Sequence, residues 1–150
     1  MQKKSNRKSR ARVNARGFMQ VVGEHYMVDS ISSPVTSKST IIVVLVLLII
    51  FRWTNELVDM KGAFLCGNIQ EEKPIYMKVL KGFEKHYLGD VLLLLLMTIY
   101  VLKQAERAFW QELTVVLKDM GYLQSTADPC LYFSWTMTGL VIWLTWIDDY

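Results

Sequence analysis

Two long apolar runs dominate the hydrophobic pattern of the chain. Residues 41–51 are apolar at every position, and a second run extends over residues 91–102. Both are shorter than the roughly 20 residues that a helix needs to cross a bilayer, so we interpret them as buried core elements. The first run follows Ser37, a favourable N-cap residue, and ends near Arg52, whose charge suits a helix C-terminus. We predict a helix beneath a sheet, although the Ile and Val content would also suit a strand.

The clearest helical pattern covers residues 104–120. Its apolar positions recur at intervals of three and four and predict one buried face, made of Phe109, Leu113, Val116, Leu117 and Met120. Gly121 follows directly and supplies the residue type that most often ends a helix.

Strand-like segments surround this helix. Residues 131–135 and 140–147 predict a hairpin that turns at Thr138 and Gly139, and residues 75–79 predict a short strand. Two further strands are expected, one within residues 1–23 before a break at Gly23, and one that carries Asp59 and ends near Phe64. This mixture of helices and strands predicts the α+β class.

Composition fits a globular domain, but the charge is distributed unevenly. Apolar residues make up 52% of the 150 positions, and the net charge is +3. Seven of the 17 basic residues lie within residues 1–16, which contain no acid, so the remaining ten basic residues face 14 acidic ones, a balance of −4. We predict that residues 1–16 are a disordered basic arm able to contact phosphates, and a solvated tail or a nuclear-import-like run is an equal alternative. The arm lacks the apolar segment of a secretory signal.

The cysteines and histidines give no clear sign of chemistry. Two cysteines, Cys66 and Cys130, do not make a disulfide framework, and we expect both to be small buried residues rather than nucleophiles. His25 and His86 lack metal-ligand spacing, so we expect them on the surface or in loops.

Three carboxylates have a more informative setting. Asp59 ends a short apolar stretch, and Asp148 and Asp149 stand together after the strand-like residues 140–147. A carboxylate on one strand and a pair at the tip of another could hold two divalent cations about 3.5–4 Å apart, which suits in-line phosphoryl transfer. An isolated Asp pair is more often a solvated turn, so the choice between a metal site and a turn depends on the surrounding sequence.

That surrounding sequence resembles the reverse transcriptase domain of Ty1/copia-type retrotransposons. Seven segments follow the motifs of this family in its order: RARVNARGF (10–18), SPVT (33–36), LVDMKGAFLCG (57–67), IYM with GFE (75–84), LKQAERAFW (102–110), ADPCLY (127–132) and WIDD (146–149). The chain departs from the family pattern at Trp146, which replaces a Tyr, at Val101, which replaces a Gly, and at Glu106 and Leu80, which replace Pro. The resemblance implies the fingers and palm of a right-hand polymerase. Because the chain ends at Tyr150, we expect the thumb to be absent, with residues 17–150 forming a partial fingers and palm domain.

The resemblance also implies roles for individual residues. Asp59, Asp148 and Asp149 would be the catalytic carboxylates and the ligands of two Mg²⁺ or Mn²⁺ ions, with Asp59 and Asp148 on neighbouring strands. Phe64 would exclude the ribose 2′-hydroxyl, unless it is an ordinary core residue. Gln104 would border the incoming nucleotide or simply begin a helix, and Arg16 would lie near the triphosphate. Contacts with nucleic acid are expected from Lys3, Lys4, Arg7, Lys8, Arg10 and Arg12.

Two functions remain open at this point. The first is an RNA-directed DNA polymerase domain of a retrotransposon polyprotein, acting on an RNA or DNA template-primer and dNTPs. The second is a non-catalytic remnant of that domain, which at most binds nucleic acid non-specifically. Since the Asp pair stands at the chain end, we expect the isolated chain to be inactive and poorly soluble. We expect no membrane association and an intracellular location, in a cytoplasmic virus-like particle or the nucleus.

Overall fold

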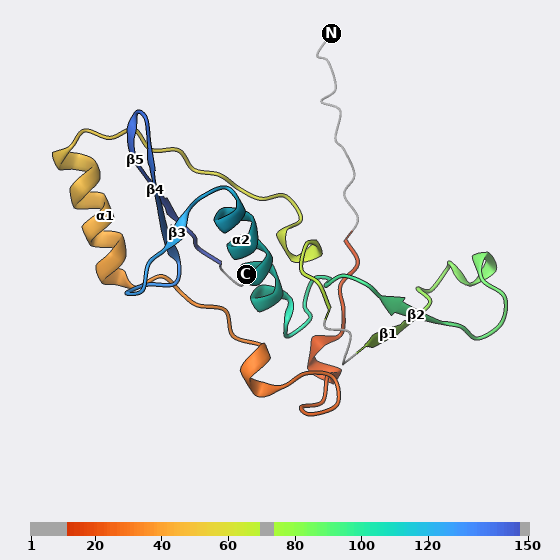
Figure 1. The fold of residues 1–150 in the computed structure, drawn as a ribbon. Helices are drawn as coiled ribbons and strands as arrows, with labels where there is room; N and C mark the ends of the chain where they lie inside the picture. The colour runs from red at the N-terminus through yellow and green to blue at the C-terminus, as the bar shows by residue number, and fades with distance from the viewer. Residues whose placement is uncertain (1–11, 70–73, 148–150) are drawn as a thin grey trace, which may run out of the picture.

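The computed structural model describes residues 12–69 and 74–147. It contains two α-helices and two small antiparallel sheets, joined by short 3₁₀ turns and extended segments (Figure 1). The mixed α and β content that the sequence predicted is therefore confirmed. None of the helices in the described ranges is long and apolar enough to cross a membrane.

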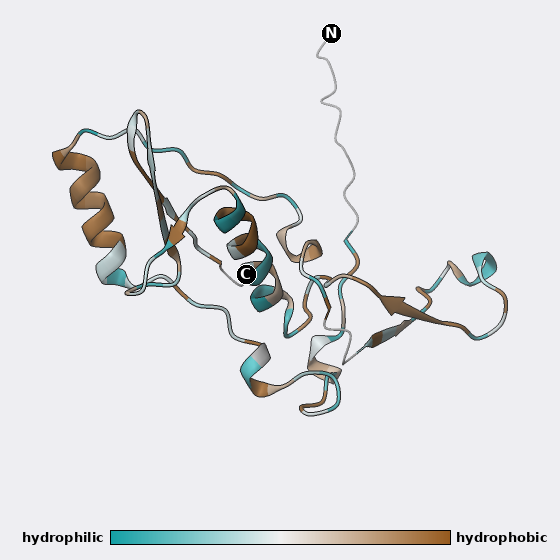
Figure 2. Cartoon of the chain, viewed as in Figure 1, coloured by the Kyte–Doolittle hydropathy of each residue, from teal (hydrophilic) through white to brown (hydrophobic). Residues whose placement is uncertain are grey.

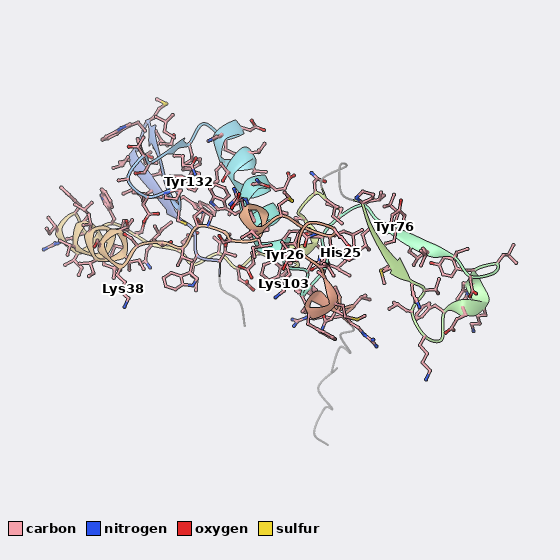
Figure 3. The ribbon with its side chains drawn as sticks, turned by 90° about the horizontal axis from the view of Figure 1, so that it is seen from below. His25, Tyr26, Lys38, Tyr76, Lys103 and Tyr132 are labelled. Carbon is pink, nitrogen blue, oxygen red and sulfur yellow. The ribbon has the colours of Figure 1, made fainter. Side chains whose placement is uncertain are left out.

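Helix α2 (Ala105–Asp119) and the three-stranded sheet beside it form the centre of the molecule. The sheet has the order β3 (Leu123–Gln124), β4 (Leu131–Thr136) and β5 (Gly139–Leu144). The main core cluster is formed between helix and sheet by Phe109, Leu113, Leu117 and Tyr132. Figure 3 shows Tyr132 between the two layers, where its hydroxyl lies 2.7 Å from that of Thr114.

The predicted α2 helix is confirmed, but part of its predicted buried face is wrong. Val116 and Met120 are 51% and 63% exposed, and the buried positions instead include Ala105, Ala108 and Thr114. The helix is followed by Gly121 with a φ of 87°, as its sequence position predicted.

The predicted β4–β5 hairpin is also confirmed, with a turn one residue earlier than expected. Thr136 pairs with Gly139, so Met137 and Thr138 are the turn residues. Gly139 has a φ of 133°, a backbone conformation that a glycine adopts without the penalty a Cβ would bring.

Helix α1 (Lys38–Ile50) is helical as predicted, but its predicted burial is wrong. The Ser37 side chain caps it by accepting a hydrogen bond from the Thr40 amide at 3.0 Å. None of its residues is buried, and Figure 2 shows that it is apolar along most of its length, with Lys38 at its polar start (Figure 3). A helix without a polar face has no preferred side to turn toward a core, so apolarity alone did not determine its packing.

The first part of the second apolar run forms one strand of a projecting hairpin instead of a buried core element. Strand β1 (Ile75–Lys78) pairs with β2 (Leu92–Leu95), and the pair extends away from the α2 region (Figure 1). Leu92 and Leu94 are 60% and 48% exposed. Its base is anchored where Ile75 joins Leu102 and Ala105 in a second core cluster. The short strand predicted at residues 75–79 is confirmed. The predicted burial of residues 91–102 is wrong for Leu92 and Leu94 but right for Leu102, which is 7% exposed.

Two other predicted strands are absent from the described residues. The segment from residue 53 to residue 60, which includes Asp59, is extended without strand pairing, and Ala63–Leu65 is a 3₁₀ turn. Residues 12–23 contain another 3₁₀ turn, Gly17–Met19, and only isolated bridges of Asn14 and Val22. A strand is stabilised by its hydrogen-bonded neighbour, which the local pattern does not specify.

Val101 has a strained backbone, because its φ of 70° is left-handed. A β-branched residue pays about 1–2 kcal/mol for this conformation, which glycine adopts freely. Since Val101 is 58% exposed, little packing would be lost on truncation. We expect Val101→Gly to raise the free energy of unfolding by about 0.5–1 kcal/mol in urea titrations.

The matched control for this prediction is Val115→Gly. Val115 is 53% exposed but lies within α2, where glycine is a poor helix former. This control should therefore lower stability by about 1 kcal/mol. Equal losses from the two substitutions would show that the backbone of Val101 is not strained.

Candidate functional site

An open groove of about 1550 Å³ crosses the molecule beside α2. One wall is the extended segment of residues 56–65, and the other is formed by residues 142–147 at the end of β5. Phe109 and Leu113 of α2 contribute apolar surface between them. The groove thus brings together two segments that are separated by more than 75 positions in the sequence.

Asp59 lies in this groove with an exposed side chain. On the other wall, Thr145, Trp146 and Ile147 line the groove directly before the Asp pair in the sequence. Asp148 and Asp149 themselves lie outside the described residues, so the predicted approach of Asp59 to Asp148 stays a prediction.

The described carboxylates do not complete a metal centre. Glu56 also lines the groove, but residues 12–69 and 74–147 contain no group of three His, Cys, Asp or Glu side chains that could hold a metal ion. Asp59 and Glu56 do provide oxygen ligands, the type that Mg²⁺ and Mn²⁺ prefer. Their donor chemistry therefore fits these ions, and the number of ligands depends on Asp148 and Asp149.

Phe64 packs against the core and also lines the groove. Its ring makes edge contacts with Tyr100 at 5.9 Å and with Phe109 at 6.4 Å between centroids, and its half-buried side chain also lines the groove. The Thr98 hydroxyl donates to the Phe64 carbonyl at 2.7 Å, which fixes the backbone here. The ring is therefore held in a defined orientation at the groove surface, whichever of its two predicted roles applies.

In the part of the basic arm that the structure describes, Arg12 lines the groove. Its guanidinium carbon lies 5.5 Å from the centre of the Tyr100 ring, within cation–π range. The other predicted arm contacts, Lys3, Lys4, Arg7, Lys8 and Arg10, lie outside the described residues. A cation held on an aromatic face beside the groove is well placed to contact a phosphate.

Arg16 and Gln104 are not brought to the groove with the other candidates. Arg16 is exposed before the turn Gly17–Met19, and neither residue is among the described residues that line the groove. Gln104 precedes α2, and its side-chain oxygen accepts a hydrogen bond from the Gln20 side-chain nitrogen Nε2 at 3.0 Å. Their nucleotide-binding roles stay predictions.

A buried polar network at the end of β5 was missed by sequence reasoning. Its members are Thr36, Asp128, Cys130 and Thr145, which are at most 5% exposed. Burial alone would raise the pKa of Asp128, but hydrogen bonds from the Thr40 hydroxyl and from the amides of Ser37 and Cys130 outweigh it and lower the pKa. Asp128 and Thr36 both lie in segments that match family motifs. This match is the feature of the sequence that could have pointed to the network.

The predictions for cysteine and histidine are only partly confirmed. Cys130 is buried as expected, and burial raises the pKa of its thiol. Cys66 is exposed, so its predicted burial is wrong; it follows a short turn at the surface, where no core element covers it. His25 and His86 lie in a turn and a 3₁₀ turn, as expected.

Comparison with known proteins assigns the chain to a family. Over residues 1–150 the chain matches the family described as reverse transcriptase (RNA-dependent DNA polymerase). The chain belongs to this family. The predicted Ty1/copia-type resemblance is confirmed, because its relatives are copia-type Pol polyproteins.

Two of these relatives of the reverse transcriptase chain come from plants. It is 34% identical over 141 residues to the retrovirus-related Pol polyprotein from transposon TNT 1-94 of Nicotiana tabacum, and 31% identical over 140 residues to that from transposon RE2 of Arabidopsis thaliana. Each match covers 93% of this chain but only 10% and 9% of the relative, so the chain spans about a tenth of their length. No solved structure matches the chain.

Proposed function

We propose that this reverse transcriptase chain supplies the nucleotidyl-transfer site of an RNA-directed DNA polymerase within a copia-type Pol polyprotein. The observation that carries the proposal is the groove, which is lined by Asp59 on one side and by the residues preceding Asp148 on the other. The substrates would be dNTPs and a primer on an RNA or DNA template. The polyprotein context is supported by the plant relatives, whose names describe Pol polyproteins.

Asp59, Asp148 and Asp149 are the proposed carboxylate ligands of Mg²⁺ or Mn²⁺. Bound divalent cations would supply charge neutralisation and a more acidic 3′-hydroxyl during phosphoryl transfer. The extended, exposed segment around Asp59 leaves its carboxylate accessible from the groove. Three carboxylates at one place repel one another, so the cluster gains stability when a cation is bound.

Arg12 and Phe64 are the proposed nucleotide contacts within the groove. Arg12 can donate to phosphate oxygens in a bidentate manner while its guanidinium stays on the Tyr100 ring. Phe64, held by Tyr100 and Phe109, presents a rigid ring that would exclude a ribose 2′-hydroxyl. Arg16, near the triphosphate, and Gln104, bordering the incoming nucleotide, stay proposed contacts by resemblance alone, because neither is among the described residues lining the groove.

The decisive test is reverse transcription by a chimera. The matching segment of the tobacco TNT 1-94 polyprotein would be replaced by this chain, and the product assayed for dTTP incorporation on poly(rA) primed with oligo(dT). We expect incorporation that depends on Mg²⁺ or Mn²⁺. An expressed chimera that binds the template-primer without extending it would instead support the alternative, a non-catalytic remnant.

A further inference from the structure

The end of β5 is held by a buried polar network, which we call the polar latch (Thr36, Asp128, Cys130 and Thr145). The Thr36 hydroxyl donates to the Thr145 carbonyl oxygen at 2.6 Å. The Thr145 amide and hydroxyl both donate to the Cys130 carbonyl oxygen, at 2.9 and 3.2 Å. Thr145 is therefore bonded both to the start of β4 and to the segment that precedes α1.

The Asp128 carboxylate connects the backbones of Ser37 and Cys130 on the other side of the latch. One carboxylate oxygen accepts from the Cys130 amide at 2.9 Å, and the other accepts from the Ser37 amide at 3.0 Å. The Cys130 thiol also donates to the Pro34 carbonyl oxygen at 3.3 Å. These bonds are buried or partly buried, so removing one leaves a polar group without water to replace its partner.

The latch holds the chain just beyond the last paired residues of the β4–β5 ladder. The β4–β5 ladder begins with the pair Leu131 and Leu144, and Thr145 lies beyond it. Trp146 is 56% exposed, and Ile147 adds an apolar contact with the core cluster. The polar latch thus supplies the directional bonds that fix the backbone of the groove wall at residue 145.

We propose that Thr36 and Asp128 are positioning residues, which hold Thr145 so that the end of β5 faces Asp59 across the groove. Neither residue lines the groove, so both act through Thr145. This inference rests on the proposed function for its catalytic meaning. Groups that orient ligands from behind in this way commonly change metal affinity about 10–100-fold when removed.

The test compares Thr36→Val with Thr36→Ser in the full chain. Val keeps the side-chain volume but removes the hydroxyl that binds Thr145, whereas Ser keeps the hydroxyl. Thr114→Val is the matched control, because Thr114 is also buried and its hydroxyl bonds to Trp110 and Tyr132 away from the latch. Two quantities are measured: the hydrogen exchange rate of the Thr145 amide relative to core amides of α2, and the affinity for Mn²⁺.

We expect Thr36→Val to speed relative exchange at Thr145 about tenfold and to weaken Mn²⁺ binding by a similar factor. Thr36→Ser and Thr114→Val should leave both quantities within about twofold of the wild type. Relative exchange at Thr145 that is the same in Thr36→Val and Thr114→Val would overturn the latch. Faster exchange with unchanged Mn²⁺ affinity would overturn its positioning role.

The two measurements keep this inference separate from the proposed function. If the wild-type chain binds no Mn²⁺, the proposed metal site and the positioning role built on it both fail. The exchange measurement then still decides whether the latch holds the end of β5.

Discussion

Replacing Asp59 with Asn should abolish polymerisation by the chimeric polyprotein, lowering dTTP incorporation at least about a hundredfold. Asn keeps the size of the side chain but removes the negative charge that would bind a divalent cation. Asp59 is exposed and lies in an extended segment outside both core clusters, so the substitution should not impair folding. Incorporation would be measured at saturating template-primer, with protein quantity checked by blotting.

Asp90→Asn is the matched control for this experiment. Asp90 is also exposed, but it lies between β1 and β2 and is not among the described residues that line the groove. Its substitution should leave incorporation within about twofold of the parent chimera, as expected for a surface change away from the site. A similar loss from both substitutions, or no loss from Asp59→Asn, would contradict the assignment of Asp59.

Leu117→Ala should lower the free energy of unfolding by about 2–5 kcal/mol. Leu117 is 2% exposed and packs with Phe109, Leu113 and Tyr132 in the main core cluster. Truncation loses the burial of three carbon atoms and leaves a cavity between α2 and the sheet. Urea denaturation followed by circular dichroism would measure the change.

Val116→Ala is the informative comparison, because sequence periodicity placed Val116 on the buried face. The structure leaves it 51% exposed, so its truncation should cost less than about 1 kcal/mol. A loss equal to that of Leu117→Ala would show that α2 is rotated relative to the structure described here.

Elements with a strong local signal could be predicted from the sequence. Helix α2 has regular apolar spacing and a terminal glycine, and the β4–β5 hairpin has two apolar strands around a short turn. Packing against distant partners could not be predicted in the same way. The apolar run at residues 41–51 predicted a helix correctly but not its exposure. A uniformly apolar run does not indicate which face of the helix packs against the rest of the protein.

The same distinction applies to the candidate site. Asp59 and the residues before Asp148 were identified by their resemblance to family motifs, and the groove brings these segments together. The polar latch could not be predicted, because the bond from Thr36 to Thr145 joins positions that are 109 residues apart. Its threonines carry no periodic or charge signal, and only the folded chain brings their hydroxyls within bonding distance.

The most direct test of the central claim is paramagnetic broadening by Mn²⁺ in amide NMR spectra of the chain. A bound ion shared by both groove walls should broaden the signals of residues 58–60 and 145–147 together at substoichiometric Mn²⁺, and Asp59→Asn should remove both effects. Asp90→Asn should leave both in place. Broadening confined to one wall, or broadening that persists in Asp59→Asn, would contradict a metal site formed across this groove.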